Sequence, residues 1–253
     1  MITLSPLNKR RLNNFISNKR GLYSFWIFMI LFIISLFANF VANEKPLLVK
    51  YNSEFYFPIL QAYPETVFGG DFETEADYRD PYVKNLISTS GWMIMPIIPY
   101  SYNTIIRDID GPAPSSPSVK NWLGTDDQAR DVLARLIYGF RISILFGFTL
   151  TFFSMIIGVS AGAVQGYFGG KTDLIFQRFM EIWSAIPTLY VLIILASVVQ
   201  PNFWWLLFIL LLFSWMGYVG VVRAEFLRAR NFDYIRAAKA LGVSNTKIMF
   251  RHL

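Results

Sequence analysis

Three long stretches of the chain contain no acidic or basic residue, and they dominate its pattern. They cover residues 21–43, 142–170 and 182–222. A helix of about 20 apolar residues crosses a hydrocarbon core roughly 30 Å thick. The third stretch is too long for one crossing, and the turn-forming sequence Gln200-Pro201-Asn202 divides it. The pattern therefore predicts four membrane spans, at residues 22–42, 142–165, 174–199 and 203–222.

Charged residues gather between and beside these stretches with opposite signs. Residues 1–21 carry five basic and no acidic side chains, residues 43–134 carry seven and thirteen, and residues 223–253 carry seven and two. Lys and Arg concentrate in the cytoplasmic loops of membrane proteins. We therefore expect a basic cytoplasmic tail at residues 1–21, both termini in the cytoplasm, and a large outer segment at residues 43–141.

The composition excludes several functional classes. Hydrophobic residues make up 54% of the chain and charged residues 16%, whereas an average soluble domain is about 25% charged. The chain has no Cys and a single His, His252, which leaves no thiolate or His-rich metal site and no Ser-His-Asp triad. The net charge of +6 could suggest nucleic acid, but its distribution indicates a membrane. We expect an all-α integral membrane protein, a polytopic helix bundle, with a lipid bilayer around it, no enzymatic activity, no cofactor and no nucleic-acid partner.

The outer segment is too long and too rich in aromatic residues for a bare connection or a disordered tract. Residues 126–138 alternate at helical period, which predicts an amphipathic helix on the outer membrane surface. The acidic residues within 70–77 keep this face soluble or steer a basic partner.

Two motifs lie within the spans, and a third lies beside one. Gly158, Gly162 and Gly166 recur at four-residue spacing, which makes a flat helix face for close helix packing, although the pattern does not say which helix packs there. Pro187 removes a helical hydrogen bond and predicts a kink. Residues 166–172, GYFGGKT, resemble a phosphate-binding loop, but the first glycine is one residue out of place and the segment follows a span. We expect no nucleotide site there.

The last 31 residues, 223–253, form a basic segment beyond the fourth span. A short helix runs to about residue 241, Gly242 ends it, and Ser244 can cap a second helix. Small residues let a partner approach closely, and the basic residues surround that contact. From the residues alone, anionic lipid and a protein partner are equally possible. The candidate contact residues are Arg236, Ala237, Ala238, Gly242 and Arg251.

These residues also carry a resemblance. Arg236-Ala237-Ala238, followed after three residues by Gly242, resembles the EAA loop of ABC importer permeases, with Arg in place of the leading Glu. The stretch YIRAAKALGVS at 234–244 is similar to the dipeptide and oligopeptide branch of that family, and residues 123–139 are similar to its C-type subunits. Residues 73–82, ETEADYRDPY, resemble the Yej-type peptide permeases within it.

The resemblance implies a transmembrane permease subunit of an ATP-driven peptide importer in the bacterial inner membrane. Its implied substrates are oligopeptides and the peptide antibiotic microcin C. The implied partners are a second permease subunit in a heterodimer, two cytoplasmic ABC ATPase subunits or domains, and a periplasmic peptide-binding protein. The outer segment would then be a periplasmic insertion, and residues 223–253 would be the coupling loop that docks on an ATPase.

Two further expectations concern the extent of the chain and the rival function. Members of the family have six spans, and their loop continues past the position of Leu253 with Leu-Pro and two more spans. The resemblance therefore implies a truncated or partial form with four of the six spans. The alternative function is a non-transporting membrane anchor or scaffold, in which the outer segment would be an interaction domain.

Overall fold

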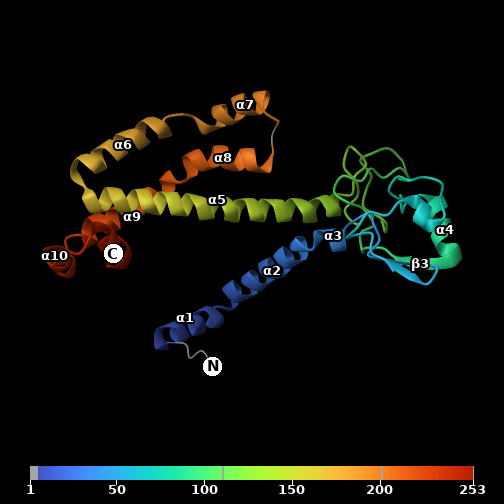
Figure 1. The fold of residues 1–253 in the computed structure, drawn as a ribbon, viewed down its shortest axis with the longest axis horizontal. Coiled ribbons are helices and arrows are strands. Elements are labelled where there is room, and N and C mark those ends of the chain that lie inside the picture. The colour runs from blue at the N-terminus through green and yellow to red at the C-terminus, as the bar shows by residue number, and fades with distance from the viewer. Residues whose placement is uncertain (1–4, 110, 201, 253) are drawn as a thin grey trace. The chain divides into compact units, whose positions relative to one another are not determined.

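A computed structural model describes residues 5–109, 111–200 and 202–252. It divides into two compact units, residues 1–144 and 145–253, and each is described by itself. Most of the described chain is helical (Figure 1). The polytopic helical fold expected from the sequence is confirmed. The described residues do not include residues 1–4 of the basic tail, Pro201 in the expected turn or the terminal Leu253.

Unit 1 begins with three consecutive helices, α1 (Pro6–Ser17), α2 (Lys19–Leu36) and α3 (Ala38–Val41). Asn18 separates the first two, because its side chain accepts the Gly21 N–H and thereby caps the start of α2. The residues expected to be a basic tail therefore include a helix. α2 is long and apolar enough to cross a membrane.

The outer segment folds into a small module with a sheet that the sequence did not predict. Three antiparallel strands, β1 (Leu48–Tyr51), β2 (Glu54–Tyr56) and β3 (Gly91–Ile94), lie in the order β2-β1-β3. Helix α4 (Pro81–Ser90) and a 3-10 helix (Glu65–Phe68) pack against this sheet. The core of the module consists of Val49, Phe68, Ala76, Tyr78, Val83 and Ile87.

A second cluster of unit 1 joins the rest of the outer segment to the helices. It contains Ala38 and Ala42 near the end of the first span, Ile98, Tyr100 and Ile106 from the segment, and Ala134 and Tyr138. The Tyr138 hydroxyl donates a 2.9 Å hydrogen bond to the Ala42 carbonyl. Both ends of the outer segment therefore pack together beside the helices.

The start of α5 (Val132–Phe168) differs from the expected interfacial helix at 126–138. Residues 126–131 form a turn, because the Asp126 carboxylate accepts the N–H groups of Gln128 and Arg130 at 2.9 Å. Asp131 then caps the new helix by accepting the Ala134 N–H at 2.8 Å. From there one continuous helix includes the expected second span, so no separate surface helix forms at 126–138.

Unit 2 contains the remainder of α5 and six further described helices. They are α6 (Gly170–Ser184), α7 (Thr188–Val198), α8 (Phe203–Ser214), α9 (Met216–Ala229), α10 (Asp233–Ala240) and α11 (Asn245–Arg251). α5 is long and apolar enough to cross a membrane, and so is the continuous stretch Phe203–Ala229. Among the described residues the chain thus has three such helices, or four if the bent pair α6–α7 forms one span.

The bend between α6 and α7 measures 62°. Pro187 stands at the N-cap of α7, where its missing N–H interrupts the helical hydrogen bonds. The indole N–H of Trp183, at the end of α6, donates to the Leu212 carbonyl of α8 at 3.0 Å. A side chain close to the break, that of Trp183, therefore binds the neighbouring helix α8.

Candidate functional site

The candidate site is the pair of short helices α10 and α11, called here the C-terminal helix pair (Figure 1). Gly242 joins them with a φ of +77°, a left-handed conformation that favours glycine. The N–H of Gly242 donates to the Lys239 carbonyl at 3.0 Å, and the N–H of Val243 donates to the Ala238 carbonyl at 3.1 Å. These two bonds form a Schellman motif, which ends α10. Ser244 caps α11 through the Lys247 N–H at 3.4 Å.

The C-terminal helix pair has a small apolar interior that includes the end of α5. Ile235, Ala238 and Ile248 are buried there together with Tyr167. Phe226 of α9 packs against the same cluster. One side of the pair is therefore covered by other residues of unit 2.

Tyr167 makes two further contacts with the pair. Its hydroxyl donates to Asn245 Oδ1 at 2.7 Å, and Lys239 Nζ lies 4.5 Å from the centre of its ring. Such a cation–π contact contributes about 0.5–1 kcal/mol at an exposed site. Tyr167 thus contacts both α10 and α11, and the sequence analysis did not single it out.

The other side of the pair is exposed and carries large apolar side chains. Leu241 is 83% exposed and Phe250 is 87% exposed. Arg236, Ala237 and Arg251 are also exposed. These apolar groups and cations are therefore not covered by other described residues of the unit.

The structure separates two alanines that the sequence analysis treated together. Ala237 is exposed, whereas Ala238 lies in the interior of the pair. The small size of Ala238 therefore serves the packing of the pair itself and does not make room for a partner. A Cβ on Gly242 would meet no atom within 4 Å, so its need for glycine comes from the backbone conformation.

The glycine row of α5 packs against α9. A Cβ added to Gly158 would lie 2.3 Å from the Trp215 carbonyl oxygen, and one added to Gly162 would lie 2.8 Å from that of Val219. A Cβ on Gly166 would meet Phe226 Cβ at 2.5 Å. The two backbones can approach this closely only because side chains are absent. The sequence indicated that this face of α5 packs closely against a helix, and the structure identifies that helix as α9.

An ion pair that the sequence analysis missed joins α6 to α9. Arg223 donates from Nε to Asp173 Oδ1 at 2.5 Å and from Nη2 to Asp173 Oδ2 at 2.7 Å. The two residues are 50 positions apart, so no spacing rule could have related them. Two-point guanidinium–carboxylate pairs combine strength with a defined geometry.

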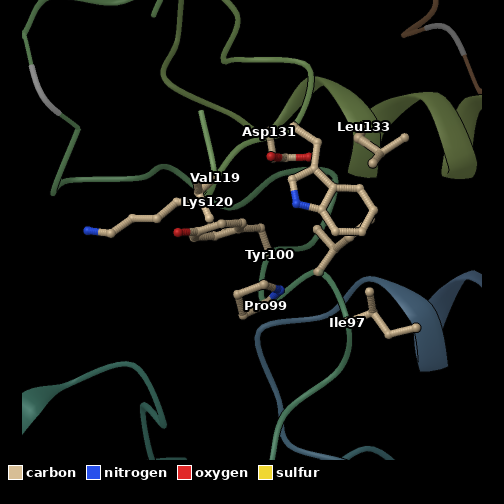
Figure 2. Close-up of a pocket in the computed structure, with 9 residues that line it drawn as sticks. Ile97, Pro99, Tyr100, Val119, Lys120, Asp131 and Leu133 are labelled. Atoms are coloured by element: carbon tan, nitrogen blue, oxygen red, sulfur yellow. The ribbon is translucent and has the colours of Figure 1, made fainter. Parts of the chain in front are cut away.

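The structure shows no metal site among the residues that it describes. They contain no group of three or more His, Cys, Asp or Glu residues suited to a metal ion. A cavity of about 210 Å³ lies in unit 1, with Asp131 and Leu133 at the start of α5 on one of its sides (Figure 2). Asp131 already accepts hydrogen bonds from Asn121 and Ala134, so its carboxylate serves the fold.

Comparison with known proteins places these features in a family. The family described as "Binding-protein-dependent transport system inner membrane component" matches residues 154–253. The chain is 55% identical to the "Inner membrane ABC transporter permease protein YejE" of Escherichia coli, over 100% of this chain and 74% of that protein. It is 54% identical to the "Peptidoglycan transport system permease protein YejE" of Agrobacterium fabrum, over 98% of this chain and 71% of that protein. It is 37% identical to the "Oligopeptide transport system permease protein OppC" of Lactococcus lactis, over 52% of this chain and 45% of that protein.

Proposed function

This chain belongs to the family of binding-protein-dependent transport system inner membrane components, and we propose that it moves peptides across the bacterial inner membrane. It is a permease subunit of an ABC importer and is not itself an enzyme, because ATP hydrolysis in this family resides in separate subunits. Relatives named for oligopeptide and dipeptide transport support peptides as the substrate class. Transport of microcin C stays a prediction.

ATPase and binding-protein partners are general to this family. We propose the finer composition: a heterodimer with a second permease subunit, two cytoplasmic ABC ATPases, and a periplasmic peptide-binding protein that delivers the substrate. The acidic outer segment would face the periplasm, and both termini would lie in the cytoplasm. The excess of basic residues at both ends of the chain supports this orientation.

The C-terminal helix pair would dock on an ATPase subunit. The observation that carries this proposal is the exposure of Leu241 and Phe250, on a helix pair whose buried residues pack against α5 and α9. Arg236, Ala237 and Arg251 are also exposed on the pair and would lie at this contact. Family membership favours protein over lipid as the partner, and a permease over a non-transporting anchor.

The packing of the pair suggests how an ATPase would drive transport. A displacement of the docked pair would move Tyr167, because Asn245 and the apolar cluster hold this residue from two helices. Tyr167 belongs to α5, so the displacement would enter a membrane-spanning helix directly. ATP binding would thereby shift the equilibrium between inward-open and outward-open states.

The proposed docking can be tested with the double variant Leu241→Asp/Phe250→Asp, expressed with the partner subunits. We expect the ATPase to dissociate during purification and the uptake of a toxic peptide to fall to background, with normal membrane insertion. The matched control for each of the two single substitutions, Leu241→Asp and Phe250→Asp, is Thr246→Asp, which adds the same single charge at an exposed polar position of the pair. Wild-type uptake and ATPase copurification in the double variant would refute docking at this surface.

A further inference from the structure

The ion pair between Asp173 and Arg223 lies where two parts of unit 2 meet. Asp173 stands in the first turn of α6, and its side chain is only 13% exposed. Arg223 stands in α9, which leads directly into the C-terminal helix pair. The two hydrogen bonds of 2.5 and 2.7 Å fix both the distance and the relative orientation of the two groups.

Gly169 connects α5 to α6, and α6 begins with a second glycine, Gly170. Gly169 has a φ of +63° and Gly170 a φ of +54°. A Cβ on Gly169 would lie 2.1 Å from Arg230 Nη1, so this glycine packs against the end of α9, whereas a Cβ on Gly170 would meet no atom within 4 Å. Glycines allow wide changes of backbone angle, so the direction of α6 depends on the contacts that side chains make around this turn.

α5, α9 and the C-terminal helix pair are held together much more closely. The glycine row brings the backbones of α5 and α9 into contact, and Tyr167 joins α5 to the pair. Arg230, at the end of α9, donates from Nη1 to the carbonyls of Gly166 and Tyr167, both at 3.4 Å. A movement of the helix pair should therefore carry α5 and α9 with it.

Few polar contacts link α6 to this group. Gln177 Nε2 donates to the buried Gln165 Oε1 at 3.1 Å, which is a neutral contact. Among the described residues, Asp173–Arg223 is the only ion pair that joins α6 to α9. α6 is also the first half of the bent pair with α7, so its direction affects the segment beyond Pro187.

We propose that Asp173 and Arg223 are positioning residues that make the bent pair α6–α7 follow the C-terminal helix pair during transport. This inference rests on the proposed function, since it needs an ATPase that moves the helix pair. Without the ion pair, the glycine turn lets α6 lag behind α5 and α9, and ATP hydrolysis is no longer converted into movement of the spans. The pair is thus required for coupling and is dispensable for ATPase docking.

The test compares three variants in the assembled transporter, reconstituted with its ATPase and binding protein. Asp173→Asn removes one partner and leaves the Arg223 charge uncompensated. Asp173→Asn/Arg223→Gln removes both charges and leaves none unpaired. Asp173→Arg/Arg223→Asp reverses the pair. The control is Arg178→Gln/Glu181→Gln, which removes an exposed ion pair on the same helix.

The readout is the amount of peptide taken up per ATP hydrolysed, measured together with ATPase copurification. We expect uptake per ATP to fall about tenfold in the neutral double variant, a usual size for coupling between sites, with the ATPase still bound. In the single variant Asp173→Asn, uptake per ATP should fall at least as much. The reversed pair should recover at least part of the loss, and the exposed control should match the wild type.

Two results would overturn the inference. Wild-type uptake per ATP in the neutral double variant would mean that α6 follows without the ion pair. Failure of that variant to assemble would mean that the pair holds the fold. Either result leaves the proposed function intact as long as the unaltered chain copurifies with an ATPase. Failure of the unaltered chain to do so would count against the proposed function itself.

Discussion

The outer module and the C-terminal helix pair differ in how they form their buried cores. In the outer module, Phe68 is fully buried among the rings of Tyr51, Tyr56, Tyr63 and Tyr78, with ring centres 5.4–6.5 Å apart. The C-terminal helix pair has only a few buried residues and takes Tyr167 from another helix to complete its core. Its largest apolar side chains point outward.

This difference indicates what each region can do alone. The outer module buries Phe68 and Tyr78 in a core made from its own residues, although other aromatic side chains, such as Phe55, Phe57 and Phe72, are exposed. The helix pair has a smaller interior, to which α5 contributes Tyr167, and its Leu241 and Phe250 are largely exposed. A substitution inside one of the two regions should therefore leave the packing of the other region unchanged.

The largest effect is expected for Phe68→Ala in the outer module. Removal of a buried phenylalanine ring costs about 3–5 kcal/mol of folding free energy, and four tyrosine rings lose their common contact. The outer module should become sensitive to limited proteolysis in the reconstituted transporter, while ATPase copurification stays unchanged. Loss of the ATPase together with the module would show that the two regions are not independent. Phe72→Ala, at an exposed position, is the control.

The second largest effect is expected for Ala238→Glu, which changes the interior of the C-terminal helix pair. A carboxylate placed in the cluster of Ile235, Ile248 and Tyr167 has no partner there, and burial of an unpaired polar group costs about 1–3 kcal/mol or more. The pair should open, and peptide uptake should be lost although the protein inserts into the membrane.

The matched variant Ala237→Glu puts the same side chain on the exposed side of the pair. It should weaken ATPase copurification without opening the pair. Since the chain has no Cys, Ile248→Cys can report on opening through its reactivity with a thiol reagent. Equal reactivity in the two glutamate backgrounds would contradict the placement of Ala238 inside and Ala237 outside.

The smallest effect concerns pH in the outer segment, at the turn of residues 126–131 beside the start of α5. Burial opposes ionisation of Asp126, but hydrogen bonds from Arg130, Gln128 and Arg135 outweigh it and hold the pKa of Asp126 below its usual range. A lowered folded-state pKa contributes stability that is complete above the unfolded value of about 3.9 and is lost as the pH falls through the folded value. Proteolytic resistance of the turn at residues 126–131 should therefore not change between pH 7 and pH 5.

Asp126→Asn should reduce that resistance at neutral pH by an amount equivalent to about 1.5–3 kcal/mol, the range for hydrogen bonds to a charged group. The difference between this variant and the wild type should shrink only at pH values below about 4. A difference that already disappears near pH 6 would mean that Asp126 does not hold this turn. The C-terminal helix pair should be unaffected in either case.

Much of the architecture follows from local patterns in the sequence. Uncharged apolar stretches mark the long helices because burial of the backbone in lipid requires about 20 apolar residues in sequence. The stop at Gly242 and the cap at Ser244 are equally local, since both depend on one residue and its immediate neighbours. The resemblance to peptide permeases, which the comparisons confirm, rests on the same short stretches.

Other features depend on residues that are distant in sequence, and only the tertiary structure decided them. The partner of the glycine row is α9, and Asp173 pairs with Arg223, 50 positions further along the chain. The sheet of the outer module pairs Lys50 with Trp92 across an intervening helix. Local periodicity carries no information about such pairings.

The two alanines of the C-terminal helix pair show this limit most clearly. The sequence by itself determined that Ala237 and Ala238 are small and adjacent on a helix. It could not determine which one faces inward, because that depends on where the end of α5 lies. Tyr167 packs on the side of Ile235 and Ile248, and Ala238 therefore fills the interior while Ala237 remains exposed.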